Sequence, residues 1–181
     1  MYRYAKINSM DISNGEGIGV AVFVQGCHAH CPQCFNPETW DFNGGKEWNK
    51  EIEKEFIECI SKSYIKRVSI LGGEPLADEN VDFTTWLVAL ILKTAITTKK
   101  DIKIWLYTGY TFEDICTKYN VNQSNHKRYN CISVCDYIVD GRFEIDKQDL
   151  TYSKVRFAGS TNQRMIDIQK TLEKGEIVLY E

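Results

Sequence analysis

Hydrophobic residues occur along the chain in short runs that alternate with stretches of helical periodicity. The runs are rich in β-branched and aromatic residues, and each leads into a turn that contains glycine, which is typical of buried strands. They cover residues 20–24, 67–71, 102–107 and 136–139. Because helices separate them, the pattern predicts βαβ crossovers and an α/β fold with a mostly parallel sheet.

The helical stretches differ in length. Hydrophobic residues recur every fourth position from Trp48 to Tyr64, with Glu and Lys on the other faces, which indicates an amphipathic helix. A second predicted helix covers about residues 80–96. A shorter one starts at Thr111, where Asp114 completes a capping box.

The end of the chain predicts one more helix. It follows Ser160, which acts as its N-cap, and stops at Gly175. Residues 117–130 are polar and predict a loop.

Size and charge exclude several classes of protein. With 181 residues, 43% of them hydrophobic, the chain suits a single domain over residues 1–181. The formal net charge of −3 gives no general attraction to nucleic acid or to an anionic membrane. The polar N-terminus lacks the core of a signal peptide, and no later segment is expected to span a membrane. We therefore expect a cytoplasmic protein whose function depends on a local site.

The seven cysteines point to such a site, since disulfides rarely persist in the cytosol. Cys27, Cys31 and Cys34 form a Cys-x3-Cys-x2-Cys pattern in a loop at about residues 26–35, directly after the first predicted strand. Thiolates so close together can wrap one iron–sulfur cluster. In a 4Fe-4S cluster, three cysteines leave one iron open to a substrate or cofactor.

Other interpretations of the cysteines remain open at this point. A zinc site could be completed by His28, His30 or a distant cysteine, although structural zinc favours paired Cys-x2-Cys ligands. We expect both histidines to face solvent. Cys131 and Cys135 could hold a second metal or a redox disulfide, but packing or surface thiols are the simpler reading.

A second signal follows the second predicted strand. Gly72, Gly73 and Glu74 precede a proline, and ligands of parallel α/β folds bind at this carboxyl end of the sheet. The glycines allow close approach of a ligand, and Glu74 can meet a cationic amine. The motif is a common turn when alone, but it gains specificity after a cysteine triplet.

These two motifs resemble those of the radical S-adenosylmethionine (SAM) superfamily. Further stretches are similar to motifs of anaerobic ribonucleotide reductase activating enzymes, and they follow one another in the expected order along most of the chain. These stretches are residues 36–45, 107–111, 140–143 and 159–164.

The resemblance implies a 4Fe-4S cluster on Cys27, Cys31 and Cys34, and SAM held by Gly72, Gly73 and Glu74. Reductive cleavage of SAM would give a 5′-deoxyadenosyl radical, which takes hydrogen from a glycine of the reductase large subunit. It also implies an incomplete, open (βα) barrel of the radical SAM type. A flavodoxin- or ferredoxin-like protein would supply the electron.

The chain departs from the family pattern at two places. Many radical SAM proteins have an aromatic residue just before the third cysteine, whereas this chain has Gln33 there and Phe35 after it, so Phe35 becomes the candidate adenine contact. Family members tend to carry arginine where this chain has Gly19. Asp140 is a candidate ribose contact, although Asp-Gly is also a common turn.

The sequence leaves alternative functions open. The nearest are activation of another glycyl radical enzyme, such as pyruvate formate-lyase, and radical SAM chemistry on a small molecule. A non-enzymatic zinc-binding or redox-sensing protein is the alternative from a different class.

Overall fold

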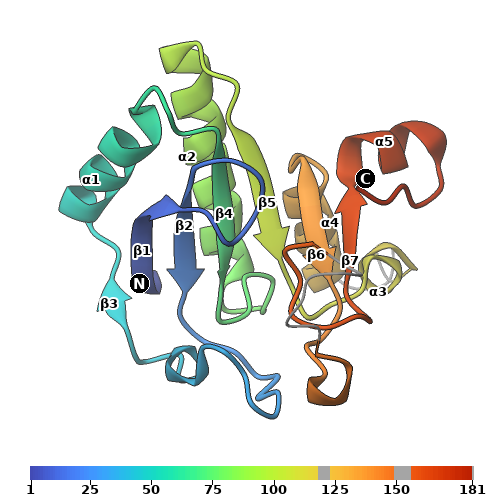
Figure 1. Cartoon of the computed structure of the whole chain (residues 1–181). Helices are drawn as coiled ribbons and strands as arrows, with labels where there is room; N and C mark the ends of the chain where they lie inside the picture. The colour runs from blue at the N-terminus through green and yellow to red at the C-terminus, as the bar shows by residue number, and fades with distance from the viewer. Residues whose placement is uncertain (118–122, 149–155, 181) are drawn as a thin grey trace.

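The computed structural model describes residues 1–117, 123–148 and 156–180. They form a seven-stranded sheet in the order β3-β1-β2-β4-β5-β6-β7 (Figure 1). The strands are β1 (Arg3–Asp11), β2 (Gly19–Val24), β3 (Lys46–Glu47), β4 (Arg67–Gly72), β5 (Lys103–Tyr107), β6 (Tyr137–Asp140) and β7 (Arg164–Asp167). The α-helices are α1 (Lys50–Ser61), α2 (Val81–Thr98), α3 (Phe112–Thr117), α4 (Gln123–Ile132) and α5 (Ile168–Lys174), and short 3-10 helices cover Pro37–Thr39 and Ile145–Lys147.

The sheet is mixed. Its centre, β2-β4-β5-β6, is parallel, while β1, β3 and β7 pair antiparallel at the edges. The four predicted strands match this parallel centre to within one residue at each end. The parallel sheet is therefore confirmed at the centre, and the three antiparallel strands are additions that the hydrophobic runs did not reveal.

The prediction of a helix directly after Ser160 is wrong. The chain first forms the edge strand β7, whose side chains Met165 and Ile166 are buried in different hydrophobic clusters. The helix α5 then begins after Asp167, whose Oδ1 accepts a hydrogen bond of 3.0 Å from the Lys170 N–H, and it ends at Gly175 as expected. A four-residue strand is too short to show alternation against the polar residues before it.

The predicted loop at residues 117–130 is also wrong where it can be judged. Thr117 ends α3, and α4 starts at Gln123; residues 118–122 lie outside the described part. The helix α4 buries the polar side chains of Asn125 and Arg128, so its inner face does not look hydrophobic. By contrast, the cap at Thr111 is confirmed, since its Oγ1 accepts from the Asp114 N–H at 3.2 Å.

The first helix, α1, is shorter than its hydrophobic period suggested. Asn49 caps it by accepting from the Ile52 N–H at 2.9 Å, so Trp48 precedes the helix and Tyr64 follows it. The helix α2 follows the prediction closely. By length and composition alone, its 18 residues are apolar enough to cross a membrane, whereas no segment as long and as apolar was expected from the sequence. Core helices of soluble proteins can be equally long and apolar, and Phe83, Leu87 and Ile91 of α2 are buried in the core.

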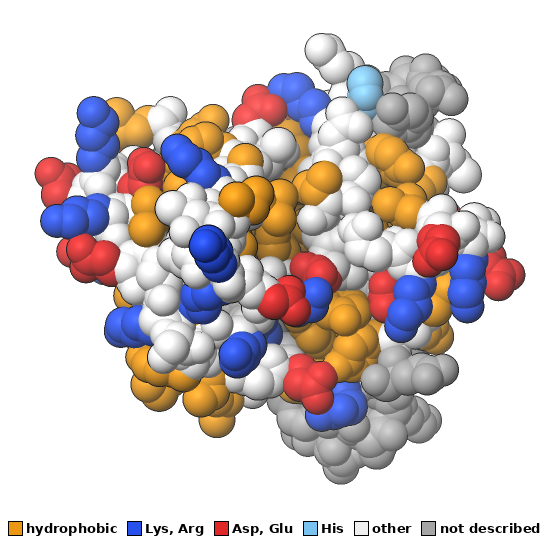
Figure 2. All heavy atoms as spheres, turned by 90° about the horizontal axis from the view of Figure 1, so that it is seen from above, with side chains coloured by type: hydrophobic (Ala, Val, Ile, Leu, Met, Phe, Trp, Pro, Cys, Tyr) orange, Lys and Arg blue, Asp and Glu red, His pale blue; other side chains and the backbone are white. Residues whose placement is uncertain are grey.

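The two faces of the sheet differ. Side chains such as Val22, Ile70 and Leu106 point into the main core, which the helices cover. Their neighbours Phe23 and Leu71 point to the opposite face, which loops cover instead. Seen from above, at the amino ends of the parallel strands, positive and negative side chains are intermixed with hydrophobic ones (Figure 2). The cysteine loop lies at the other end of the sheet (Figure 1).

Candidate functional site

The cysteine loop leaves β2 and is held by the segment that follows it. The N–H of Gly26 donates to the Thr39 carbonyl at 2.7 Å, and the N–H of Cys27 donates to the Trp40 carbonyl at 3.1 Å. His30 and Gln33 have positive φ values of 45° and 54°, which coil the chain between the cysteines. The loop therefore has a defined path that does not depend on helix or strand.

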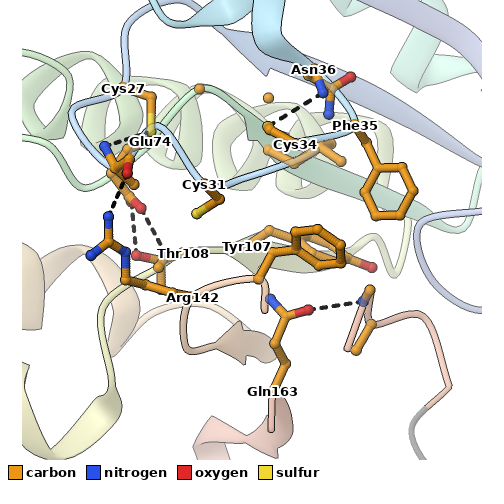
Figure 3. A pocket seen from close by; sticks show the side chains of 18 of the residues that line it. Cys27, Cys31, Cys34, Phe35, Asn36, Glu74, Tyr107, Thr108, Arg142 and Gln163 are labelled. Atoms are coloured by element: carbon orange, nitrogen blue, oxygen red, sulfur yellow. Dashed lines mark hydrogen bonds between the residues drawn. The ribbon is translucent and has the colours of Figure 1, made fainter. Parts of the chain in front are cut away.

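The three cysteines line one cavity of about 370 Å³ (Figure 3), a size typical of small-molecule sites. The N–H groups of Ala29 and Asn36 donate to the sulfurs of Cys27 and Cys34 at 3.3 and 3.4 Å. Burial raises the pKa of Cys27, so its thiolate needs a positive partner such as iron.

The donor set fits an iron–sulfur cluster. In the described residues, no three His, Cys, Asp or Glu side chains are grouped to hold a single metal ion. Cysteine ligands of a 4Fe-4S cluster each bind a different iron, so they need not converge on one point. The three half-buried thiols and the N–H groups directed at sulfur suit such a cluster.

The Gly-Gly-Glu loop lies beside the cysteine loop, as expected. Val24 pairs with Gly72 at the ends of β2 and β4, and the Gly73 N–H donates to the Val24 carbonyl at 2.9 Å. The Glu74 N–H donates to the Gly26 carbonyl at 2.8 Å. Asn80 joins the two loops, because its Nδ2 donates to the carbonyls of Gly26 and Glu74.

The glycines at this junction are required by chain contacts as well as by any ligand. A Cβ on Gly73 would lie 2.4 Å from the Gly26 carbonyl oxygen, and one on Gly72, with φ +107°, would lie 2.6 Å from the Phe23 Cα. Gly26 has φ +102°, and its Cβ would lie 2.0 Å from the Phe42 ring. No larger residue fits these positions without movement of the backbone or of the Phe42 ring.

We predict that Gly26→Ala lowers the free energy of unfolding by more than about 1–3 kcal/mol, the cost of backbone strain alone, because the ring clash adds to it. Gly17→Ala is the matched control. Gly17 also has positive φ, but a Cβ there would lie 3.9 Å from the Lys66 Cβ, an ordinary contact distance. Denaturant unfolding measures both variants, and equal losses would show that the Phe42 contact is unimportant.

Glu74 is buried, with 7% of its surface exposed. Its Oε1 accepts from the Leu76 N–H at 2.9 Å and the Thr108 hydroxyl at 2.7 Å, and its Oε2 accepts from the Gly109 N–H at 2.7 Å. Burial raises the pKa of Glu74, and these donors oppose that rise. The carboxylate thus has a fixed orientation at the cavity wall.

The opposite wall comes from the loops after β5 and β6 and from residues 157–163 (Figure 3). Arg142 Nη2 donates to the Ala29 carbonyl at 2.5 Å, which ties this wall to the cysteine loop. Phe143 packs on Phe35 with ring centroids 5.0 Å apart. Gln163 accepts from the Gly159 N–H at 2.8 Å and donates to the Gly141 carbonyl at 2.9 Å.

Some of these residues had no role assigned from sequence. Thr108, Gly109, Arg142 and Gln163 lie in stretches that carry the family resemblance, and the first three follow predicted strands. For Thr108, Gly109 and Arg142, the signal in the sequence was their position just after the strands β5 and β6, at the carboxyl ends.

Of the predicted site residues, Cys27, Cys31, Cys34, Phe35, Gly72, Gly73 and Glu74 all line the cavity. Asp140 does not belong to that lining. Its Oδ2 accepts from the Phe112 N–H at 2.8 Å, and its Oδ1 accepts from Arg164 Nε at 3.0 Å. A ribose would have to compete with these bonds for the carboxylate.

The simpler interpretation from the sequence applies to the two histidines of the cysteine loop and to Cys131 and Cys135. His28 and His30 are exposed; His30 stacks on Trp40, and the His28 ring packs at a tilt against Phe42. Cys131 and Cys135 are buried, and burial raises the pKa of both, with that of Cys131 at about 11. They act as packing residues.

The chain is similar to known iron–sulfur proteins. A family model described as a 4Fe-4S single cluster domain matches residues 13–166. A protein of Enterobacteria phage T4 is 35% identical over 162 residues, covering 90% of this chain and 92% of its own length. Others from Salmonella typhi and Escherichia coli K12 are 34% and 33% identical, and they cover 89% and 88% of this chain and 96% and 95% of their own lengths. All three are named anaerobic ribonucleoside-triphosphate reductase-activating proteins.

The fold, the site and the family match together define the class of protein, which is an α/β protein with a single 4Fe-4S cluster domain. Given the identity and coverage of these relatives, the chain belongs to the family of anaerobic ribonucleoside-triphosphate reductase-activating proteins.

Proposed function

We propose that this chain activates an anaerobic ribonucleoside-triphosphate reductase by reductive cleavage of SAM at a 4Fe-4S cluster bound to Cys27, Cys31 and Cys34. The observation that carries the proposal is one cavity shared by the cysteine loop and the Gly-Gly-Glu loop. The names of the relatives supply the reductase as target. We also propose that residues 1–181 form one domain and that the sheet and its helices are an open form of the radical SAM barrel.

When bound, such a cluster supplies the electron that cleaves SAM into methionine and a 5′-deoxyadenosyl radical, which takes hydrogen from a glycine of the reductase. The protein's own residues position the reactants. Glu74 holds the methionyl ammonium group, because its carboxylate is already oriented by three donors. Gly72 and Gly73 keep that part of the wall free of side chains.

Phe35 is the proposed adenine contact. It is 60% exposed and packs on Phe143 across the cavity, so an apolar surface is available for a base. Asp140 stays a proposed ribose contact, with Arg164 and the Phe112 N–H as its present partners. A flavodoxin- or ferredoxin-like donor in an oxygen-free cytoplasm completes the scheme.

An assay of 5′-deoxyadenosine formation tests the target. With reductant and SAM, we expect slow cleavage by the reconstituted protein alone and faster cleavage when the reductase large subunit is added. Pyruvate formate-lyase should not stimulate cleavage. Stimulation by that enzyme instead would reassign the target, and no cleavage by cluster-loaded protein would contradict the proposed SAM chemistry. Failure of the protein to take up a cluster would favour the zinc or redox-sensing alternative.

A further inference from the structure

Arg128 of α4 carries a positive charge into the interior, and only 6% of its surface is exposed. Its Nη1 donates to Asn125 Oδ1 at 2.5 Å, and its Nη2 donates to Asp78 Oδ1 at 2.6 Å. The side chain of Asp78 is 64% exposed, so water already solvates that carboxylate. An ion pair with one partner in water contributes little stability and does not by itself explain why the arginine is buried.

The other contacts of Arg128 join two loops. Its Nε donates to the Leu76 carbonyl at 2.7 Å. Its Nη2 also donates to the Tyr110 hydroxyl at 3.1 Å, and its Cζ lies 4.3 Å from the centroid of the Tyr110 ring. Leu76 lies in the loop after β4, and Tyr110 lies in the loop after β5. One guanidinium group therefore ties together the loops that leave two neighbouring strands.

The same two loops supply the three hydrogen-bond donors to Glu74. One donor is the N–H of Leu76, whose carbonyl is held by Arg128. The other two are the hydroxyl of Thr108 and the N–H of the next residue. The Tyr110 N–H donates in turn to Thr108 Oγ1 at 3.1 Å. Arg128 thus holds the groups on both sides that fix the carboxylate.

Arg128 acts on Glu74 from outside the cavity. It does not belong to the cavity lining, so it would not touch a bound ligand. Burial raises the pKa of Glu74, and the positive charge of Arg128 is one of the influences that oppose this rise. A lysine could supply a similar charge, but only the planar guanidinium presents several donors in a fixed fork. These contacts match a role in fixing the carboxylate.

We propose that Arg128 is a positioning residue for SAM: it holds the loops after β4 and β5 together, so that Glu74 meets the methionyl ammonium group in one orientation. This inference rests on the proposed function, in which Glu74 binds that group. Without the guanidinium, the carboxylate itself would have to hold the two loops together. A ligand would then have to order this part of the wall when it binds, which lowers its affinity.

The test is Arg128→Gln in the cluster-loaded protein, with Lys127→Gln as the matched control. Lys127 is the preceding residue of α4, pairs with Asp82 at the surface and does not line the cavity. We expect Arg128→Gln to keep the cluster absorbance and to raise the SAM dissociation constant about 10-fold, equivalent to one hydrogen bond to a charged group. Lys127→Gln should match the unaltered protein. An unchanged SAM dissociation constant for Arg128→Gln would overturn the inference.

Two further measurements separate an effect on Glu74 from general damage to the cavity. The first uses 5′-methylthioadenosine, which has the adenosine part of SAM but no ammonium group. We expect Arg128→Gln to leave its dissociation constant unchanged, and equal losses for both ligands would contradict the positioning role. The second is the double variant Glu74→Gln/Arg128→Gln. It should bind SAM no more weakly than Glu74→Gln alone, since Arg128 acts through that carboxylate, whereas losses that multiply would show two independent effects.

Arg128→Lys is a second variant, because loss of a buried cation can also unfold α4. Denaturant unfolding checks that each variant is folded. We expect lysine to raise the SAM dissociation constant as well, since an ammonium group cannot reach both Leu76 and Tyr110 in the geometry of the fork. A normal SAM affinity with lysine would remove the role of the guanidinium.

Failure of this inference differs from failure of the proposed function. If the unaltered cluster-loaded protein does not bind SAM, or if Glu74→Gln leaves the affinity unchanged, the proposed role of Glu74 fails. If Glu74→Gln weakens SAM binding and Arg128→Gln does not, only the positioning role of Arg128 fails.

Discussion

Alanine at Cys27, Cys31 or Cys34 is expected to abolish both the iron–sulfur absorbance of the reconstituted protein and its cleavage of SAM. Each sulfur lies on the same cavity, and two of them already accept N–H bonds that stabilise thiolate. Loss of one of three ligands leaves two irons without protein ligands, so the cluster should no longer assemble in stable form.

Cys59→Ala is the control for these cysteine variants. Cys59 lies in α1, is half-buried against the core and does not line the cavity. It should retain full absorbance and full SAM cleavage. If all three loop variants kept both properties as well, the ligand assignment would be refuted.

Replacing Glu74 with Gln is expected to weaken SAM binding about 10- to 100-fold while the cluster remains intact. Hydrogen bonds to a charged group contribute about 1.5–3 kcal/mol, and each 1.4 kcal/mol is tenfold in affinity. Gln keeps one acceptor oxygen, which the Thr108 hydroxyl and the Leu76 N–H can still use. Its amide nitrogen would face the Gly109 N–H that now donates to Oε2, so denaturant unfolding is measured beside SAM binding to separate the loss of charge from a loss of stability.

Glu79→Gln is the matched control for that substitution, because Glu79 pairs with His28 on the surface and does not line the cavity. Equilibrium binding of SAM to cluster-loaded protein measures both variants. An unchanged dissociation constant for Glu74→Gln would reject the ammonium contact.

The sequence was most informative where residue type and spacing carry chemistry. The cysteine pattern and Gly72–Glu74 could be joined in one site because parallel strands present their carboxyl ends together, and β2 and β4 are adjacent. The glycines were harder to interpret, since their clashes with Phe23, Phe42 and the Gly26 carbonyl appear only in the folded chain.

Other features depend on long-range packing that local patterns do not encode. The helix α4 was missed because it buries Arg128, which donates to the Leu76 carbonyl at 2.7 Å, 52 residues away in sequence. The strand β7 is defined by its pairing with β6. Likewise, Asp11, Asn14 and Arg67 form one network only after the sheet places β1 and β4 on either side of β2.

Anaerobic electron paramagnetic resonance of the reduced, cluster-loaded protein with SAM and an anaerobic ribonucleotide reductase large subunit tests the central claim most directly. We expect a cluster signal that changes when SAM is added, followed by a glycyl-radical doublet on the large subunit. A SAM-sensitive cluster without that doublet would contradict the reductase as target, and the absence of any cluster signal would contradict the site itself.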